Sequence, residues 1–445
     1  MLPFGYPVVP PPAQSNSVSP VSSLNEASLP GVSAKAERPI RLAYFVSHPI
    51  QYQAPLLRRI AQEPDIDLTV FFSSDLSVRA YKDPGFGVSV QWDVPLLDGY
   101  KYEFLPRLRD SDRLGFASPL NWGIFNRLRR GRFDAVWVFG YHRLACLNAI
   151  LAAKLLGMPV LLRSDSCLFD RARPQPVLAA KRIFARMLRP AVSCVTAVGR
   201  ANKEYWQHYF GSRFPVFTMP YAIDNDLFRN RALQASSQRE ELRRELGLQA
   251  GLPVILFASK LQTDKRCSDL LDAYMRLGPE GGEPPACLLI VGDGEERPSL
   301  EAWVRDKRLS RVHFLGFRNQ KELPRFFDLC DVFVLPSSHD AWGLIVNEVM
   351  NAGRPVIVTD RVGCYPDLVQ NGFNGFVYPA LDVDALTRCL RQLIEDPALR
   401  SSMGGNSLRV IQQYSFEEDV KGLRGALAKA VIGFARRHCQ NERIH

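Results

Sequence analysis

Two carboxylates and a row of backbone amides can share one pocket around residue 340. Asp340 stands in a polar turn after an apolar run, and Glu348 lies about one turn into the helix that the pattern predicts next. The first amides of that helix, near Gly343, Leu344 and Ile345, have no partner within the helix and suit a phosphate. Helical side chains tilt toward the N-terminus, so Glu348 can reach the mouth that Asp340 borders. Because carboxylates accept hydrogen bonds from sugar and ribose hydroxyls, the segment favours a nucleotide sugar as ligand.

A plainer interpretation of this segment stays open. Asp340 would then cap the helix, and Glu348 would be an ordinary surface glutamate. A helical wheel places Glu348 beside Leu344 and Ala352, at the border of the apolar arc, neither plainly exposed nor plainly in the core. The motif alone therefore does not separate ligand binding from a structural role.

Two lysines follow the apolar run 254–258, which we expect to be a buried strand. Ammonium groups beyond a strand end, here those of Lys260 and Lys265, are natural partners of a diphosphate. Lysines in polar loops are common, so this pair alone indicates no site. A Gly-x-Gly beginning at Gly292 follows the next expected strand but lacks the third glycine of a dinucleotide fingerprint.

Polar side chains also follow the strands expected at 40–46, 135–139 and 160–162 in the N-terminal half. Ligands of open parallel sheets bind beyond the carboxyl ends of the strands. Taken singly, each of these side chains fits a structural role, as a loop hydrogen bond or a cap, better than a contact with substrate. The candidates for one shared cleft are His48, His142, Arg163 and Asp165.

The elements that must position these residues alternate between strand and helix. The strand 40–46, the amphipathic helix 56–61 and the strand 66–72 form a βαβ unit, which predicts a parallel sheet. No G-x-G-x-x-G follows the first strand, which weighs against a dinucleotide-dependent oxidoreductase. The irregular, aromatic-rich stretch 73–125 is expected to form loops and short strands over a cleft, where substrate choice is often made.

The chain has 445 residues, 46% apolar and 23% charged, as in an ordinary globular protein of two to three domains. Its formal charge is +10, and the densest basic stretches are 129–132 and 181–189 in the N-terminal half. This excess indicates either a solvated basic face or contact with an anionic partner such as a membrane surface. Nucleic acid is not an expected partner, because no zinc finger, RNP-like stretch or similar module occurs.

The cysteines, the most apolar window and the N-terminus indicate the cellular compartment in which we expect the protein. The nine cysteines include no C-x-x-C pair and no Cys/His cluster of zinc spacing, so we expect a reducing compartment and no structural metal. The apolar window 144–162 contains lysine, glycine and proline, which favours helix, turn and strand over a membrane span. With no signal peptide evident, we expect a cytoplasmic protein, with peripheral contact at the inner membrane face as an option.

Taken together, the motifs resemble the retaining family 4 glycosyltransferases (glycosyltransferase group 1) of the GT-B fold. The resemblance covers about residues 40–435 and is strongest over 252–380. It implies an α/β chain with two Rossmann-like parallel-sheet domains that face each other across a cleft. The motifs that carry it are Lys260 with Lys265, Gly292-Asp293-Gly294, Phe314 to Phe317, Asp331 to Ser337, Asp340 with Glu348, and Asn371 to Gly375.

The resemblance divides the chain into four parts. Residues 1–38, rich in Pro, Ser, Ala and Val, form a tail that their composition predicts to be disordered. Residues 39–225 are the acceptor-side domain, 226–415 the nucleotide-sugar domain, and 416–445 a helix that crosses back to the first domain.

The resemblance also implies site roles. Lys260 and Lys265 would neutralise the departing diphosphate, with the helix amides and Gly292 on the donor side. Glu348 would hold the ribose hydroxyls, and Asp340 would contact the donor sugar near its reacting carbon. The donor would be a UDP- or GDP-sugar, the acceptor a glycan, a lipid-linked sugar or a small molecule, and configuration would be retained. No cofactor or metal is expected.

The sequence departs from the family pattern at several positions. Asp340 stands where the family usually has Glu, and Lys260 stands where it usually has Arg. Asp367 stands where the family often has a Glu after the glycine-containing turn that follows the strand 355–359. The first loop is not glycine-rich. Similar His-Pro-Ile-Gln-Tyr openings in some bacterial members make His48 and Gln51 candidate acceptor or phosphate contacts.

Three functions fit this pattern. The first is a nucleotide-sugar-dependent transferase. The second is a catalytically silent GT-B protein that binds a glycan or nucleotide, and only the shortened Asp340 favours it. The third, an epimerase or sugar phosphorylase on the same plan, has no positive signal in the sequence.

Overall fold

The computed structural model describes residues 38–108, 114–169, 173–279 and 282–441, with side chains through Val431. The predicted disordered tail, 1–38, lies outside the described residues except for Arg38. Among the described residues, none of the helices has the length and apolar character needed to cross a membrane.

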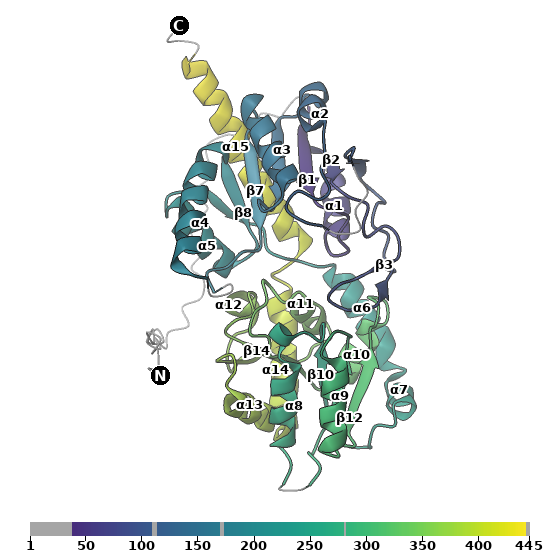
Figure 1. Cartoon of the computed structure of the whole chain (residues 1–445). Coiled ribbons are helices and arrows are strands. Elements are labelled where there is room, and N and C mark those ends of the chain that lie inside the picture. Colours follow the sequence, from purple (N-terminus) through teal and green to yellow (C-terminus); the bar gives the residue numbers. More distant parts are fainter. Residues whose placement is uncertain (1–37, 109–113, 170–172, 280–281, 442–445) are drawn as a thin grey trace. The chain divides into compact units, whose positions relative to one another are not determined.

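The N-terminal half forms one parallel sheet of seven strands (Figure 1). Its inner strands are mostly apolar and nearly fully buried because both faces are covered, whereas its two edge strands are partly exposed. In sheet order they are β5 (Lys101–Phe104), β2 (Ile66–Phe72), β1 (Ile40–Val46), β6 (Ala135–Phe139), β7 (Val160–Ser164), β8 (Cys194–Ala197) and β9 (Val216–Thr218).

Helices cover both faces of this sheet. One face packs against α1 (Gln53–Ala61) and the closing helix α15 (Phe416–Asn441), which contacts β6, β7, β8 and β9. The other face carries α2 (Ile124–Gly131), α3 (Leu144–Leu155), α4 (Gln175–Leu188), the short 3-10 turn η1 (Arg189–Ala191) and α5 (Arg200–Phe210).

The C-terminal half forms a second parallel sheet of six strands. In sheet order they are β12 (Val312–Gly316), β11 (Cys287–Val291), β10 (Val254–Ala258), β13 (Val332–Leu335), β14 (Val356–Thr359) and β15 (Gly375–Tyr378). The helices packed on it are α6 (Asn225–Ser236), α7 (Arg239–Glu245), α8 (Cys267–Met275), α9 (Arg297–Asp306), α10 (Leu323–Leu329), α11 (Ile345–Met350), α12 (Tyr365–Leu368), α13 (Val383–Glu395) and α14 (Pro397–Ile411). The α/β class with two parallel sheets is therefore confirmed.

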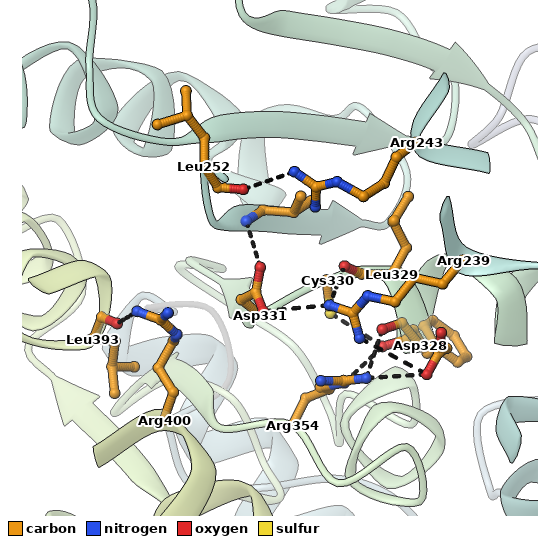
Figure 2. A network of polar contacts seen from close by, with 12 residues as sticks. Arg239, Arg243, Leu252, Asp328, Leu329, Cys330, Asp331, Arg354, Leu393 and Arg400 are labelled. Carbon is orange, nitrogen blue, oxygen red and sulfur yellow. Dashed lines mark hydrogen bonds and ion pairs between the residues drawn. The ribbon is translucent and has the colours of Figure 1, made fainter. Parts of the chain in front are cut away.

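A polar network fixes the base of the strand and helix around residue 340 (Figure 2). Asp331, at the start of β13, accepts hydrogen bonds from the Val254 amide at 2.8 Å and from Arg239 at 3.3 Å. Arg354, just after α11, donates to the Asp328 carbonyl at 2.6 Å and pairs with the carboxylate of the same residue at 3.1 Å. The start of the segment is thus anchored to β10 and α7, and its end is anchored to α10.

Several helices, among them α6 and α14, stand where no helix was expected. In the irregular stretch 73–125, where loops and short strands were expected, a small antiparallel hairpin joins β3 (Tyr81–Lys82) to β4 (Ser89–Val90). The domain boundaries near 225 and 415 stay predictions.

Candidate active site

A pocket of about 600 Å³ is lined by residues from both halves of the chain. Most lie beyond the carboxyl ends of the parallel strands, as expected for sheets of this kind. The pocket brings together most of the residues singled out from the sequence: His48, Gln51, Lys260, Lys265, Gly292, Asp340, Gly343, Leu344, Ile345 and Glu348.

The turn before α11 is tightly built. Gly343 has a φ of +85°, and a Cβ there would lie 2.7 Å from Val362 Cγ1, so only glycine fits. The Asp340 amide donates to the Arg361 carbonyl at 3.1 Å, and the Gly363 amide donates back to the Asp340 carbonyl at 2.9 Å. These bonds hold the Asp340 side chain and the start of α11 at one wall of the pocket.

Asp340 forms an ion pair within the pocket. Lys265 Nζ lies 2.7 Å from Asp340 Oδ2, and the other carboxylate oxygen accepts from the Trp342 amide at 3.2 Å. The cap residue of α11 is Leu344, so the interpretation of Asp340 as the cap of this helix is wrong. Lys265 ends a 3-10 turn, 263–265, whose Asp264 carbonyl accepts from the Ser338 amide at 2.8 Å.

Glu348 is buried, with 8% of its surface exposed, yet its side chain lines the pocket. Its Oε2 atom has no hydrogen-bond partner among the described residues. Burial raises the pKa of this carboxyl to about 8, against the opposing effect of a hydrogen bond from Gln320. An ordinary surface glutamate has none of these properties, so that interpretation is wrong. The orphaned oxygen is an acceptor available to a hydroxyl of a ligand.

Lys260 meets an acidic partner from the other half of the chain. Its Nζ lies 2.8 Å from Asp83 Oδ1 and 4.8 Å from the centroid of the Phe86 ring. Asp83 Oδ1 also accepts from the amides of Gly85 and Phe86, at 2.8 and 3.0 Å. Burial disfavours ionisation of Asp83, but the hydrogen bonds from Lys260 and the Phe86 amide prevail, and its pKa is lowered. In this structure Asp83 therefore neutralises the charge of Lys260.

The segment that carries Asp83 also seals one side of the pocket. The Phe86 and Phe317 rings meet edge to face with centroids 4.8 Å apart. Asn319 donates to the Gln91 carbonyl at 2.6 Å, and the Lys321 amide donates to the Asp93 carboxylate at 3.0 Å. Sequence reasoning missed Asp83. The Asp-Pro-Gly-Phe-Gly turn that begins with it was a visible signal.

The Asp83–Lys260 ion pair yields a testable prediction. Asp83→Asn removes the charge that competes with a ligand phosphate for Lys260, so we expect it to tighten binding of a nucleoside diphosphate by about 3- to 10-fold. Titration calorimetry with UDP and GDP measures this. Asp98→Asn, the same charge change at an exposed position, should leave affinity unchanged. Weaker binding in Asp83→Asn would mean that Asp83 helps to hold the ligand.

The remaining candidates take other positions. Arg163 is 2% exposed and pairs with Asp419 of α15 at 3.4 Å, because β7 continues through Ser164 and keeps Arg163 inside the sheet. It lies outside the pocket, contrary to its predicted place. Neither Asp165 nor His142 lines the pocket. Asp165 accepts a hydrogen bond from the Tyr221 hydroxyl at 3.3 Å, and His142 is exposed.

His48 does line the pocket. Its Nδ1 lies 2.8 Å from Ser47 Oγ. Burial lowers the pKa of His48 to about 4, and the nearby charge of Arg143 acts in the same direction. The imidazole is therefore neutral at physiological pH and can donate or accept a hydrogen bond.

Comparisons with known proteins agree on one kind of domain. Residues 238–409 match the family model described as "Glycosyl transferases group 1". Alpha-D-kanosaminyltransferase from Streptomyces kanamyceticus is 26% identical over 298 residues, which cover 65% of this chain and 75% of the relative. 2-Deoxystreptamine N-acetyl-D-glucosaminyltransferase from Streptomyces fradiae is 32% identical over 279 residues, 60% of this chain and 64% of the relative.

Solved structures resemble the whole two-sheet body. Anabaena Alr3699/HepE in complex with UDP and glucose superimposes with a TM-score of 0.65 at 18% identity, covering 87% of this chain and 99% of that one. WaaG, a glycosyltransferase involved in lipopolysaccharide biosynthesis, gives a TM-score of 0.60 at 16% identity with the same coverage. At these identities the likeness concerns the fold.

Proposed function

We propose that the chain transfers a sugar from a nucleotide-sugar donor, because residues 238–409 match the model of the group 1 glycosyl transferases and the two parallel sheets have the GT-B fold of the solved neighbours. The acceptor would be a glycan, a lipid-linked sugar or a small molecule. One observation carries the proposal: two ammonium groups and a buried carboxylate with an orphaned oxygen line the same pocket.

These groups can bind the phosphates and the ribose of a nucleoside diphosphate. Lys260 and Lys265 supply positive charge for the two phosphates, and the backbone from Gly343 to Ile345 adds amide donors. The free oxygen of Glu348 accepts from ribose hydroxyls. The solved complexes of the GT-B neighbour HepE with UDP and with UDP-glucose support a uridine nucleotide as the donor.

The reaction would proceed through stabilisation of the leaving group. As the bond between sugar and diphosphate breaks, the sugar gains oxocarbenium character and the diphosphate gains charge. Lys265 and Lys260 offset that charge in a partly buried pocket, which lowers the barrier. Asp340 would contact hydroxyls of the donor sugar once Lys265 turns to the phosphate. We propose that configuration is retained and that the lysines take the place of a metal ion.

A panel of UDP-, GDP- and ADP-sugars tests the proposal. We expect at least one to raise the melting temperature of the protein and to be hydrolysed slowly without acceptor. A nucleotide sugar that binds but is never cleaved, with any acceptor tried, would favour a catalytically silent GT-B protein. If none is hydrolysed and none shifts the melting temperature, the transferase proposal fails.

A further inference from the structure

A second hollow lies at the opposite edge of the N-terminal sheet, where its strands begin. It has a volume of about 980 Å³ and includes residues that immediately precede three strands: Pro159 before β7, Ser193 before β8 and Pro215 before β9. In a parallel sheet, strand starts and strand ends lie at opposite edges. This hollow is therefore separate from the candidate active site.

Four cations converge on the hollow from four different elements. They are Lys154 of α3, Arg186 of α4, Arg189 of η1 and Lys429 of α15, all exposed, and none of the described residues that line the hollow is acidic. Lys154 Nζ donates to the Pro190 carbonyl at 3.1 Å, which keeps its charge at the rim. Like charges so placed repel one another and create a strong positive potential, so the hollow attracts an anion.

Large aliphatic side chains surround these cations instead of being buried. Leu151 and Leu155 of α3 are 57% and 69% exposed, and Ile183 and Met187 of α4 are 61% and 73% exposed. Within each helix the two positions are four residues apart, so they lie on one face. Each pair is next in sequence to a cation of the hollow: Leu155 follows Lys154, and Met187 follows Arg186.

We propose that this edge of the N-terminal half docks on an anionic membrane surface. The hollow would take the phosphate of a lipid headgroup, and the aliphatic side chains of α3 and α4 would enter the boundary between headgroups and acyl chains. Exposed aliphatic side chains among cations are the composition of an interfacial membrane contact. A nucleic acid gains little from such side chains, because they neither stack on bases nor hydrogen bond.

Vesicle binding, measured without donor or acceptor, tests this docking independently of the proposed transferase reaction. Co-sedimentation of the full chain uses vesicles of phosphatidylcholine alone and vesicles with about 30% phosphatidylglycerol. We expect at least 10-fold tighter binding to the anionic vesicles, weakened by added salt.

Two double variants separate charge from apolar insertion. Arg186→Glu with Arg189→Glu should weaken binding to anionic vesicles by roughly 10²-fold, because it removes two attracted cations and adds two repelled carboxylates. Ile183→Ser with Met187→Ser should weaken it by about 10-fold or more, because inserted apolar area is lost. Unchanged melting temperatures show that both variants are folded.

The matched control makes the same charge change elsewhere. Arg305→Glu with Arg388→Glu alters two exposed helix residues of the C-terminal half and should leave vesicle binding unchanged. If this control loses vesicle binding equally, the effect depends only on the net charge of the protein, and the proposal is overturned. Equal binding to neutral vesicles, or binding of inorganic phosphate or duplex DNA without binding of vesicles, would overturn it as well.

Discussion

Lys265→Ala is expected to lower kcat for sugar transfer by roughly 10²- to 10³-fold, with a smaller change in KM. Lys265 Nζ is partly buried at the pocket wall, where its charge can offset the charge that develops on the diphosphate. That charge is greater in the transition state than in the bound donor, so losing the ammonium group affects the chemical step most. Initial rates at saturating donor and acceptor measure the effect.

Control variants separate the loss of catalysis in Lys265→Ala from the effect of leaving Asp340 unpaired. Removing Lys265 leaves the Asp340 carboxylate without its partner at 2.7 Å, and that unpaired charge alone would repel a phosphate. If the double variant Lys265→Ala with Asp340→Asn recovers full activity, the loss came from the stranded carboxylate and not from catalysis. Lys265→Arg should keep much of the rate, and Lys421→Ala, on the exposed face of α15, should keep all of it.

The strands were readable because burial on both faces leaves a strand nearly continuously apolar. β1 and β2 were predicted at the bounds that the structure has, Ile40–Val46 and Ile66–Phe72. The strand–turn–helix segment around Asp340 could be predicted for a related reason. Its elements are neighbours in sequence, so local rules place Asp340 and Glu348 at one mouth.

Helix α14 was missed because its packing requires a poor helix former. A Cβ at Gly404 would lie 2.1 Å from the Gly353 carbonyl oxygen, so the helix passes too close to the turn after α11 for any other residue. Glycine in a helix interior lowers helix propensity by about 1 kcal/mol relative to alanine. Tertiary packing outweighs that local signal, and no sequence window displays it.

The errors in the site arose from contacts between distant residues. Asp83 stands 177 positions before Lys260, and Arg163 stands 256 positions before Asp419. The first contact brings an unpredicted acid to the pocket, and the second removes a predicted cation from it. No local sequence pattern predicts either pair. The first depends on how the β3–β4 hairpin packs, and the second depends on how α15 packs.

Glu348→Gln is expected to abolish most donor use while stabilising the free protein at alkaline pH. The loss of a charge-assisted acceptor for ribose hydroxyls should lower kcat/KM by roughly 10- to 100-fold. The stability gain follows from burial, which raises the pKa of Glu348 from 4.5 to about 8. A carboxyl whose pKa is raised on folding contributes stability that is complete below its unfolded pKa and is lost as pH rises through the folded value.

Calorimetric unfolding of wild type and Glu348→Gln between pH 5 and 9 measures this difference. Glutamine does not titrate, whereas Asp367 and Asp419, whose pKa values burial raises to about 6 and about 7, titrate in both proteins and cancel. The variant should gain on wild type as pH rises across this range, by up to roughly 4 kcal/mol between pH 5 and pH 8. Ribose hydroxyls donate to the ionised carboxylate, so UDP affinity should rise with pH in wild type only. Parallel stability profiles would mean that Glu348 is already ionised in the free protein, and the pocket would then hold a buried charge before the donor arrives.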